Sequence, residues 1–351
     1  MEYRLLGRTG LKVSTFGFGT MSFGGVGRFA GTGDTTGEEA RRQIDMCIEA
    51  GVNLFDTSDA YSAGRSEEEL AQALGNRRNW VLIATKCYFA TGRGVNDRGA
   101  NRRHIIRACE ASLRRLKTDF IDLYQIHGQD RQTPPEETLR AMDDLVRQGK
   151  VRYIGSSNYS GWFMMKSLAV SDRLGTERFA SQQIQYSLLH RDAENELLPL
   201  AVEEGVGSII WSPLATGYLS GKFKHGEVAA PTRLAHHGWL DKYQERGPRI
   251  VAELEAIAST RPGASASQVA LNWVARRAGV SSILLGARTA DQLAGNLAAA
   301  SWSLTDEEVR RLDEVSATPL PYPYDIHQTV GLGAERDAPL QLQPPIRAPA
   351  D

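Results

Sequence analysis

The sequence predicts an α/β protein whose eight parallel strands close into a (β/α)8 barrel. Along its 351 residues, short apolar runs alternate with amphipathic segments, and this alternation is typical of parallel strands joined by right-handed crossovers. Eight such units over about 280 residues fit a closed barrel. An open doubly wound sheet is the competing fold. Gly17-Phe18-Gly19 begins the glycine pattern of that fold, but the residues that follow do not complete it.

The strands that we expect, in chain order, are residues 15–19, 53–56, 80–86, 121–127, 151–156, 182–185, 208–211 and 281–285. An N-terminal β-hairpin precedes them, with strands at 3–6 and 11–13 around a turn at Arg8-Thr9-Gly10. Long irregular loops follow the first and seventh strands, at 24–33 and 223–247. We therefore expect one barrel domain at 1–316 and an irregular proline-rich tail at 317–351.

Apolar stripes and capping signals mark the helices between the strands. Ile105, Cys109, Leu113 and Leu116 share one helix face, as do Ile44, Cys47 and Ile48. Six pairs match the capping-box pattern: Thr36 with Glu39, Ser66 with Glu69, Thr133 with Glu136, Ser265 with Gln268, Thr289 with Gln292, and Thr305 with Glu308.

The overall composition favours a small-molecule partner. There are 41 basic and 42 acidic residues and a net charge of -1, which gives no long-range attraction for nucleic acid or an anionic membrane. No apolar run is long enough for a membrane span, and the first residues lack a signal-peptide pattern. Cys47, Cys87 and Cys109 form no disulfide or metal pattern. We therefore expect a cytoplasmic protein without a metal site.

Four side chains with acid–base chemistry stand at or just beyond successive strand ends, where barrel enzymes place their active residues. They are Asp56, Tyr61, Lys86 and His127. A tyrosine hydroxyl has an unperturbed pKa of about 10, and a nearby ammonium lowers it by stabilising the phenolate. Lys86 has this role toward Tyr61 if Asp56 holds it in position. A buried ion pair, a core histidine and a loop aromatic are the structural alternatives.

The motifs around these residues resemble those of the aldo-keto reductase family. The residues that carry the resemblance are 53–61 (NLFDTSDAY), 66–67 (SE), 83–86 (IATK), 122–127 (DLYQIH), 155–158 (GSSN), Gln183, 211–214 (WSPL) and 286–289 (GART). It covers about residues 1–316. The details at 97–99 (DRG) and 186–189 (YSLL) are closer to the aryl-alcohol-dehydrogenase-like and potassium-channel-β-subunit branches. The resemblance implies an NADPH-dependent reduction of aldehydes or ketones, with Asp56, Tyr61, Lys86 and His127 as the catalytic tetrad.

The resemblance also implies an extended NADP(H) site over the barrel mouth. Ser157, Asn158 and Gln183 would bind the nicotinamide carboxamide, and Trp211 would stack on the ring, at a position where many relatives carry tyrosine. Arg288 would bind the 2′-phosphate, and Gln292 and Asn296 the adenine. The remaining residues of the expected site are Thr20, Met21, Asp56, Ser212, Pro213, Leu214, Gly217, Leu219, Gly221, Lys222 and Gly286. Some relatives carry basic residues at the positions of Gly286 and Gln292, so use of NAD(H) as well stays open.

The substrate pocket is expected to have aromatic walls from Phe23, Tyr88, Phe89 and Trp239. Three function classes remain open: a working oxidoreductase on small carbonyl or alcohol compounds, a cofactor-binding regulatory subunit like the channel β subunits, and a non-redox barrel. The adjacent His236-His237 pair lies in a loop and does not have the helical spacing of metal ligands. Association into a homo-oligomer also stays open.

Overall fold

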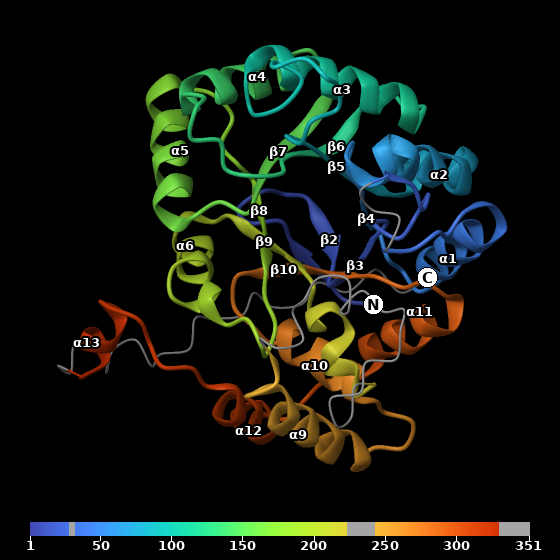
Figure 1. The fold of residues 1–351 in the computed structure, drawn as a ribbon, viewed down its shortest axis with the longest axis vertical. Coiled ribbons are helices and arrows are strands. Elements are labelled where there is room, and N and C mark those ends of the chain that lie inside the picture. Colours follow the sequence, from blue (N-terminus) through green and yellow to red (C-terminus); the bar gives the residue numbers. More distant parts are fainter. Residues whose placement is uncertain (28–31, 223–242, 330–351) are drawn as a thin grey trace.

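Eight parallel strands form a closed barrel in the computed structural model, which describes residues 1–27, 32–222 and 243–329 (Figure 1). In the order of hydrogen bonding, the strands are β10 (Val280–Leu285), β3 (Phe16–Gly19), β4 (Leu54–Asp56), β5 (Leu82–Cys87), β6 (Ile121–Ile126), β7 (Val151–Ser157), β8 (Ser181–Gln185) and β9 (Gly207–Trp211). The predicted barrel is confirmed, and each predicted strand overlaps one of these. The open-sheet alternative is excluded because β10 pairs with both β3 and β9.

The predicted N-terminal hairpin closes the amino-terminal end of the barrel. Its strands β1 (Tyr3–Leu5) and β2 (Lys12–Ser14) are antiparallel, and β2 crosses the centre of the ring in Figure 1. Leu6 and Val13 have no exposed surface and pack against apolar side chains of the barrel interior. Arg4 donates hydrogen bonds to the carbonyls of Val280 and Ala275, which ties the hairpin to the start of β10.

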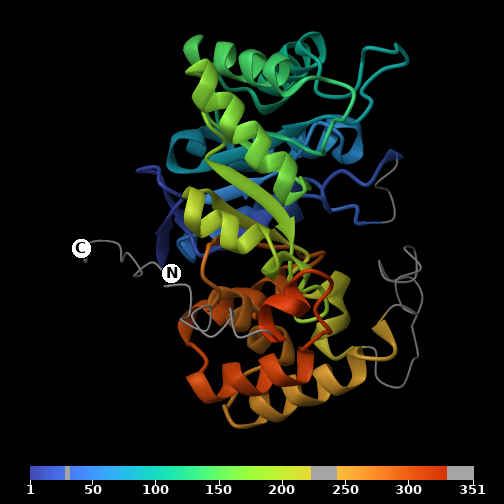
Figure 2. The same cartoon turned by 90° about the vertical axis from the view of Figure 1, so that its left-hand side faces the viewer.

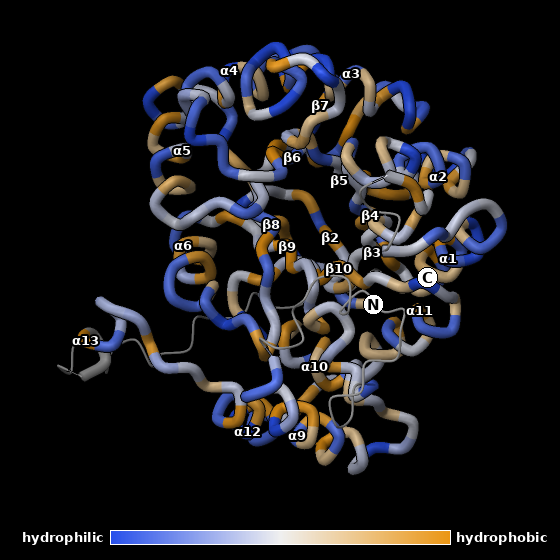
Figure 3. Tube along the Cα trace, viewed as in Figure 1, coloured by the Kyte–Doolittle hydropathy of each residue, from blue (hydrophilic) through white to orange (hydrophobic). Residues whose placement is uncertain are grey.

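Helices surround the barrel on its outer side (Figures 1 and 2). They are α1 (Gly37–Glu49), α2 (Arg65–Leu74), α3 (Arg102–Leu116), α4 (Pro135–Arg147), α5 (Gly161–Leu174), α6 (Leu197–Glu204), α9 (Gly247–Ser259), α10 (Ala266–Ala275), α11 (Ala290–Leu297) and α12 (Asp306–Ser316). The predicted stripe of α3 is buried at Ile105, Cys109 and Leu116. Figure 3 shows apolar and polar residues interleaved along these helices, as expected for helices that cover a barrel with one face.

The helix caps differ in part from the sequence prediction. Thr305 and Glu308 form the complete capping box, whereas Ser265 and Thr289 cap their helices without the reciprocal bond. Three other assignments were wrong. Thr36 precedes α1 but makes no side-chain cap bond; Ser66 lies inside α2, and Thr133 precedes the N-cap of α4, which is Pro134. The Ser66 hydroxyl instead donates to the Thr20 carbonyl in the loop after β3, and the Thr133 hydroxyl donates to Asp130 of its own loop.

The barrel interior changes from apolar to polar along the strands. Leu54, Ala84 and Leu123 form an apolar layer above the hairpin. Side chains alternate between the two faces of a strand, so the next inward positions lie two residues later. These positions are Asp56, Lys86 and Gln125, all nearly or fully buried. The polar layer thus lies at the carboxyl ends of β4, β5 and β6.

The segment after residue 316 is not wholly irregular. A short helix, α13 (Tyr324–Thr329), lies apart from the barrel in Figure 1, and the Tyr324 hydroxyl donates to Glu196 Oε1 over 2.6 Å. The proposed division at residue 316 stays a prediction. All three cysteines are buried thiols. In the described part of the chain, no helix combines the length and the apolar character that a membrane crossing requires.

Trp273 of α10 provides a test of the packing around the barrel. It is fully buried, stacks on Tyr186 with a centroid distance of 5.3 Å, and donates to Asp313 of α12. We expect Trp273→Ala to lower the free energy of unfolding by about 3–5 kcal/mol, because it removes a large buried ring. Trp80, with 68% of its surface exposed, is the matched control. Its replacement by alanine should cost less than about 0.5 kcal/mol. Equal losses in urea unfolding would contradict this role of Trp273.

Candidate active site

The centre of the candidate site is the Lys86 ammonium inside the barrel. Lys86 is fully buried, and its Nζ has three acceptors: Asp56 Oδ1, the Thr57 carbonyl at 2.8 Å and the Tyr61 hydroxyl at 3.3 Å. An ammonium has three N–H donors, so each has one partner. The structure thus brings together three of the four predicted catalytic residues from β4, β5 and the loop after β4.

The charge on Lys86 is maintained by its neighbours. Burial alone acts to lower the pKa of the Lys86 ammonium, but the Asp56 carboxylate and Tyr61 act in the opposite direction and leave this pKa above its usual range. Asp56 Oδ2 accepts two further hydrogen bonds, from Gln125 Nε2 at 3.1 Å and Gln183 Nε2 at 2.8 Å. A buried ion pair needs such additional partners, since desolvation of both charges is costly. Lys86 therefore remains a cation at neutral pH.

A sharp backbone turn holds Tyr61 over Lys86. Ser62, Ala63 and Gly64, the three residues after Tyr61, all have positive φ, a conformation that is unfavourable for residues with a Cβ. The Ser62 hydroxyl donates to the Phe23 carbonyl at 2.9 Å. Beyond the turn, Ser66 Oγ donates to the Thr20 carbonyl at 2.7 Å. These bonds tie the loop after β4 to the loop after β3.

His127 follows β6 and lies against Tyr61. The two rings meet edge to face with centroids 5.7 Å apart, and Phe89 contacts the imidazole with a centroid distance of 4.8 Å. The Nδ1 atom of His127 lies 3.1 Å from the Ser58 hydroxyl. All four predicted catalytic side chains are therefore gathered at one point of the barrel rim.

The residues expected at the nicotinamide are linked to one another. The Asn158 amide donates to the His127 carbonyl and to Ser157 Oγ, both at 3.1 Å. Its oxygen accepts from the Trp211 indole N–H at 3.1 Å. Because both amide hydrogens of Asn158 are engaged, only its oxygen is suited to a further partner. Ser157 in turn donates to the Gln183 carbonyl.

The other residues expected at the cofactor follow the carboxyl ends of three strands, β3, β9 and β10. Thr20 and Met21 follow β3, and Thr20 Oγ1 donates to the Asp56 carbonyl. Ser212, Pro213, Leu214, Gly217, Leu219, Gly221 and Lys222 follow β9 in and around the short helix η5 (Ala215–Ser220), where Leu219 packs in the core. Gly286, Arg288, Gln292 and Asn296 follow β10. Gln292 Oε1 accepts from the Arg288 N–H, and the Arg288 side chain is exposed.

Of the aromatic residues expected to line the substrate pocket, some lie beside His127 and one lies in the core. Phe89 is partly exposed beside His127, and Tyr88 packs edge to face on it with a centroid distance of 5.5 Å. Phe23 has no exposed surface and packs against Phe18, so its side chain belongs to the core. Trp239 lies outside the described residues, as do His236 and His237. No group of three or more potential metal ligands occurs in the described ranges.

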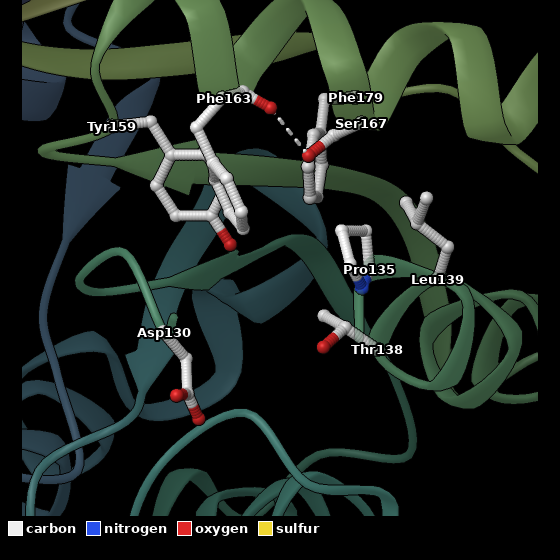
Figure 4. Close-up of a pocket in the computed structure, with 8 residues that line it drawn as sticks. All are labelled: Asp130, Pro135, Thr138, Leu139, Tyr159, Phe163, Ser167 and Phe179. Carbon is white, nitrogen blue, oxygen red and sulfur yellow. Dashed lines mark hydrogen bonds between the residues drawn. The ribbon is translucent and has the colours of Figure 1, made fainter. Parts of the chain in front are cut away.

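Two surface hollows lie away from the tetrad. One is a narrow gap between α4, α5 and the barrel, too tight to hold a water molecule and lined by residues such as Asp130, Tyr159 and Phe163 (Figure 4). The other opens between residues 131–136 and the start of α5, beside the exposed Trp162. Asp130 accepts from the Ala100 N–H and the Thr133 hydroxyl, both at 2.8 Å. It therefore links the loops after β5 and β6 rather than forming part of the tetrad.

A second buried acidic cluster lies behind the site, on the outer face of β5. Glu67 is fully buried and accepts from Thr85 Oγ1 and Arg115 Nε, both at 2.6 Å. Nearby, Asp59 Oδ2 has no hydrogen-bond partner within the described structure. Burial raises the pKa of the Asp59 carboxyl well above its usual range, and the charge of Glu67 acts in the same direction, against Arg115 and Ser58. Asp59 is thus favoured as a neutral acid.

Sequence reasoning missed Gln125, Ser58 and the Glu67–Arg115 pair. Gln125 is a polar residue near the carboxyl end of the buried strand β6, which is a signal that could have identified it. Ser58 and Glu67 carried no comparable signal, because their partners are 69 and 48 residues away in sequence. Only the folded barrel brings these pairs together.

Comparisons with known proteins give matches along most of the chain. The model of the Aldo/keto reductase family matches residues 15–317. A protein from Bacillus subtilis named "Uncharacterized oxidoreductase YrpG" is 38% identical over 91% of this chain and 97% of its own length. Two proteins named "Probable voltage-gated potassium channel subunit beta" are also similar. The one from Arabidopsis thaliana is 36% identical over 85% of this chain and 91% of its length, and the one from Oryza sativa is 35% identical over 90% and 96%.

Asp59→Asn tests whether the buried Asp59 carboxyl is protonated in the folded protein. An aspartate of the unfolded chain has a pKa of about 3.9. Because the folded-state pKa is higher, the contribution of Asp59 to stability is fully present below about pH 3.9 and is lost as pH rises toward the folded-state pKa. The Asp59→Asn variant has no carboxyl at this position and so does not lose stability in this way as pH rises. We therefore expect its free energy of unfolding, relative to the wild type, to rise with pH above about 4, by at most about 1.4 kcal/mol per unit.

Urea unfolding of both proteins between about pH 4 and pH 8 measures this difference. Glu203→Gln, at an exposed position of α6, is the control and should show no such trend. A difference between Asp59→Asn and wild type that is the same at every pH would contradict the neutral form of Asp59.

Proposed function

The chain belongs to the aldo/keto reductase family, and on this premise we propose that it is an NADPH-dependent reductase of aldehydes or ketones. The observation that carries the proposal is the hydrogen-bonded arrangement of Asp56, Lys86 and Tyr61 beside His127 at the carboxyl ends of the strands. This is the end of a barrel at which catalytic side chains occur.

Tyr61 is the general acid of the proposed reaction. Its oxygen accepts a hydrogen bond from the Lys86 ammonium, so its own proton is directed to another acceptor, which we propose is the substrate oxygen. A cation at hydrogen-bond distance stabilises the phenolate that remains after proton transfer. In the reverse direction, the phenolate takes the proton of the alcohol. General acid catalysis of this kind contributes on the order of 10²–10⁴-fold.

His127 stabilises the charge that develops on the substrate oxygen. The ring lies beside Tyr61, so a donor on it and the Tyr61 hydroxyl would both reach one oxygen atom. Donors held in place before the reaction supply transition-state stabilisation without reorganisation. Phe89, which packs on the imidazole, and Tyr88 would form the apolar wall next to the carbonyl carbon. The substrate class that fits is a small carbonyl compound with an apolar substituent.

The chain offers groups that fit a nicotinamide dinucleotide. A bound NADPH supplies the hydride for the carbonyl carbon. The Asn158 oxygen and the amide oxygen of Gln183 are suited to accept from a carboxamide N–H, and Trp211 is held in place by its bond to Asn158. Gly217 has a positive φ and open space at the position of a Cβ, so its backbone is accessible to a diphosphate. Lys222 is exposed on the same loop.

Selection of NADP(H) rests on Arg288 in this proposal. The Arg288 guanidinium is exposed one residue before Thr289, the N-cap of α11, and a guanidinium forms forked bonds with phosphate. Gln292, whose side chain accepts from the Arg288 N–H, adds no charge. Use of NAD(H) as a weaker second cofactor is therefore part of the proposal.

A second function is supported by two of the similar proteins, which carry the name of probable channel β subunits. In that case the barrel would bind NADPH and act on a partner protein. The two functions differ in turnover. A regulatory subunit predicts tight NADPH binding with little consumption of it across a broad panel of aldehydes and ketones, whereas the enzyme predicts steady consumption.

Tyr61→Phe tests the proposed acid. The change removes one hydroxyl and keeps the ring, so NADPH binding should remain close to normal while kcat for carbonyl reduction falls by about 10²-fold or more. NADPH absorbance measures kcat, and the quenching of protein fluorescence measures binding. Tyr153→Phe, on the amino-terminal part of β7, is the matched control and should retain full activity. Turnover of Tyr61→Phe within twofold of wild type would exclude this role.

Arg288→Ala tests the phosphate contact. Loss of a charge-assisted bond to the 2′-phosphate should raise KM for NADPH by about 10-fold or more and leave KM for NADH nearly unchanged, since NADH has no phosphate there. Initial rates with each cofactor at saturating substrate give the two constants. Arg102→Ala, at an exposed position at the start of α3, is the control. Equal changes for both cofactors would contradict the assignment.

A further inference from the structure

Ser58 connects His127 to the buried acid Asp59. The hydroxyl of Ser58 is completely buried, and its Oγ lies 3.1 Å from His127 Nδ1 and 3.4 Å from Asp59 Oδ1. It also accepts a hydrogen bond from the Ala60 N–H at 3.2 Å. Ser58, Asp59 and Ala60 lie in the loop between β4 and Tyr61, behind the His127 imidazole.

The hydroxyl has one hydrogen to donate and two acceptors that compete for it. One of its lone pairs is occupied by the Ala60 N–H. If the hydrogen is directed to His127 Nδ1, the neutral imidazole carries its proton on Nε2. If it is directed to Asp59, Nδ1 must carry the proton and donate to Ser58, because the lone pairs of Ser58 Oγ and His127 Nδ1 repel each other when no hydrogen lies between them. The tautomer of a histidine is set by the bond that its other nitrogen makes.

The surroundings of Asp59 decide between these two arrangements. Glu67 of α2 and Arg115 of α3 face this carboxyl, together with Cys87 of β5 and Tyr124 of β6. The Arg115 Nε is bound to Glu67, and Asp59 Oδ2 has no hydrogen-bond partner in the described part of the chain. Burial and the charge of Glu67 raise the pKa of Asp59. A neutral Asp59 competes poorly for the Ser58 hydrogen, and His127 is also the closer acceptor.

We propose that Ser58 is a positioning residue, whose hydroxyl donates to His127 Nδ1 and so holds the imidazole in the tautomer with its proton on Nε2. The proposal rests on the proposed function, in which His127 donates to the substrate oxygen. With Nδ1 accepting from Ser58, Nε2 carries the ring hydrogen that is donated in this bond. Ser58 and Asp59 touch neither substrate nor cofactor and act through His127 alone.

The tautomer is measurable without any turnover. The ¹⁵N shifts of protein labelled in its histidines distinguish a protonated from an unprotonated ring nitrogen, and a His127→Gln sample assigns the signal among the seven histidines. In the wild type at neutral pH, we expect Nε2 protonated and Nδ1 with the shift of a hydrogen-bonded acceptor. In Ser58→Ala, the Nδ1 signal should move toward that of a nitrogen without this bond. A wild-type His127 protonated on Nδ1 would overturn the proposal, whether or not the protein folds with alanine at position 58.

Kinetics of the same variants test the consequence for reduction. Ser58→Ala should lower kcat by about tenfold, less than the 10²–10³-fold expected when such a donor is removed outright, and should leave the Kd of NADPH unchanged. The loss should shrink in acid, where the imidazole is protonated, since an imidazolium carries hydrogens on both nitrogens. Asp59→Asn keeps the Ser58 hydroxyl and should retain kcat within about twofold.

Ser282→Ala is the matched control, because Ser282 is an equally buried serine whose hydroxyl binds the Ser14 carbonyl. It should keep the wild-type kcat and pH profile. A Ser58→Ala enzyme within twofold of wild type at every pH would overturn the proposal. So would a loss of kcat that does not change with pH, as this would indicate a structural effect. Absence of turnover in the wild type would instead refute the proposed function and leave the tautomer measurement as the decisive test of Ser58.

Discussion

The arrangement of the whole site depends on one buried cation, the Lys86 ammonium. Desolvation makes such a charge costly unless every one of its hydrogens has a partner. The barrel supplies an acceptor from each of three consecutive parts of the chain: the end of β4, the residue after it, and the loop beyond. These bonds fix where Tyr61 stands. A tyrosine elsewhere on the rim could not serve as the third acceptor, so the position of the candidate acid follows from the requirement to satisfy Lys86.

The Asp56 carboxylate, the anion of the ion pair, likewise needs a partner for each of its oxygens. Asp56 uses one oxygen for Lys86 and the other for the amides of Gln125 and Gln183. Gln183 thereby joins the ion pair to the row of Ser157 and Asn158 at the ends of β7 and β8. The row runs on through the Trp211 indole. One continuous network of hydrogen bonds therefore connects the proposed acid with the groups proposed to hold the cofactor, and rigid placement of both is what hydride and proton transfer to one carbonyl demand.

The sequence was sufficient for the barrel, because strand alternation and helix stripes are local periodic signals. It also indicated the four catalytic candidates, since strand ends converge in any barrel. It did not indicate how the loops are held. Ser66 matched a capping box, but its hydroxyl is recruited by the Thr20 carbonyl, 46 residues away. Phe23 was expected in the pocket, but packing on Phe18 takes it into the core. Where a polar or aromatic side chain chooses between a local and a distant partner, only the tertiary structure decides.

Backbone strain was equally invisible in the sequence, and it concentrates around the candidate site. The described residues with positive φ, other than glycine, are Ser62, Ala63, Lys117, Asn158, Ser212, Ala215 and Thr216. All but Lys117, which ends α3, follow the carboxyl end of a barrel strand. Such conformations persist only where surrounding bonds enforce them. Asn158 illustrates this, because its side chain is held from three directions while its backbone bends away from β7. The stability of the barrel beneath these turns offsets the cost of their strained backbone. The strained residues occur where side chains from different strands must face a common point.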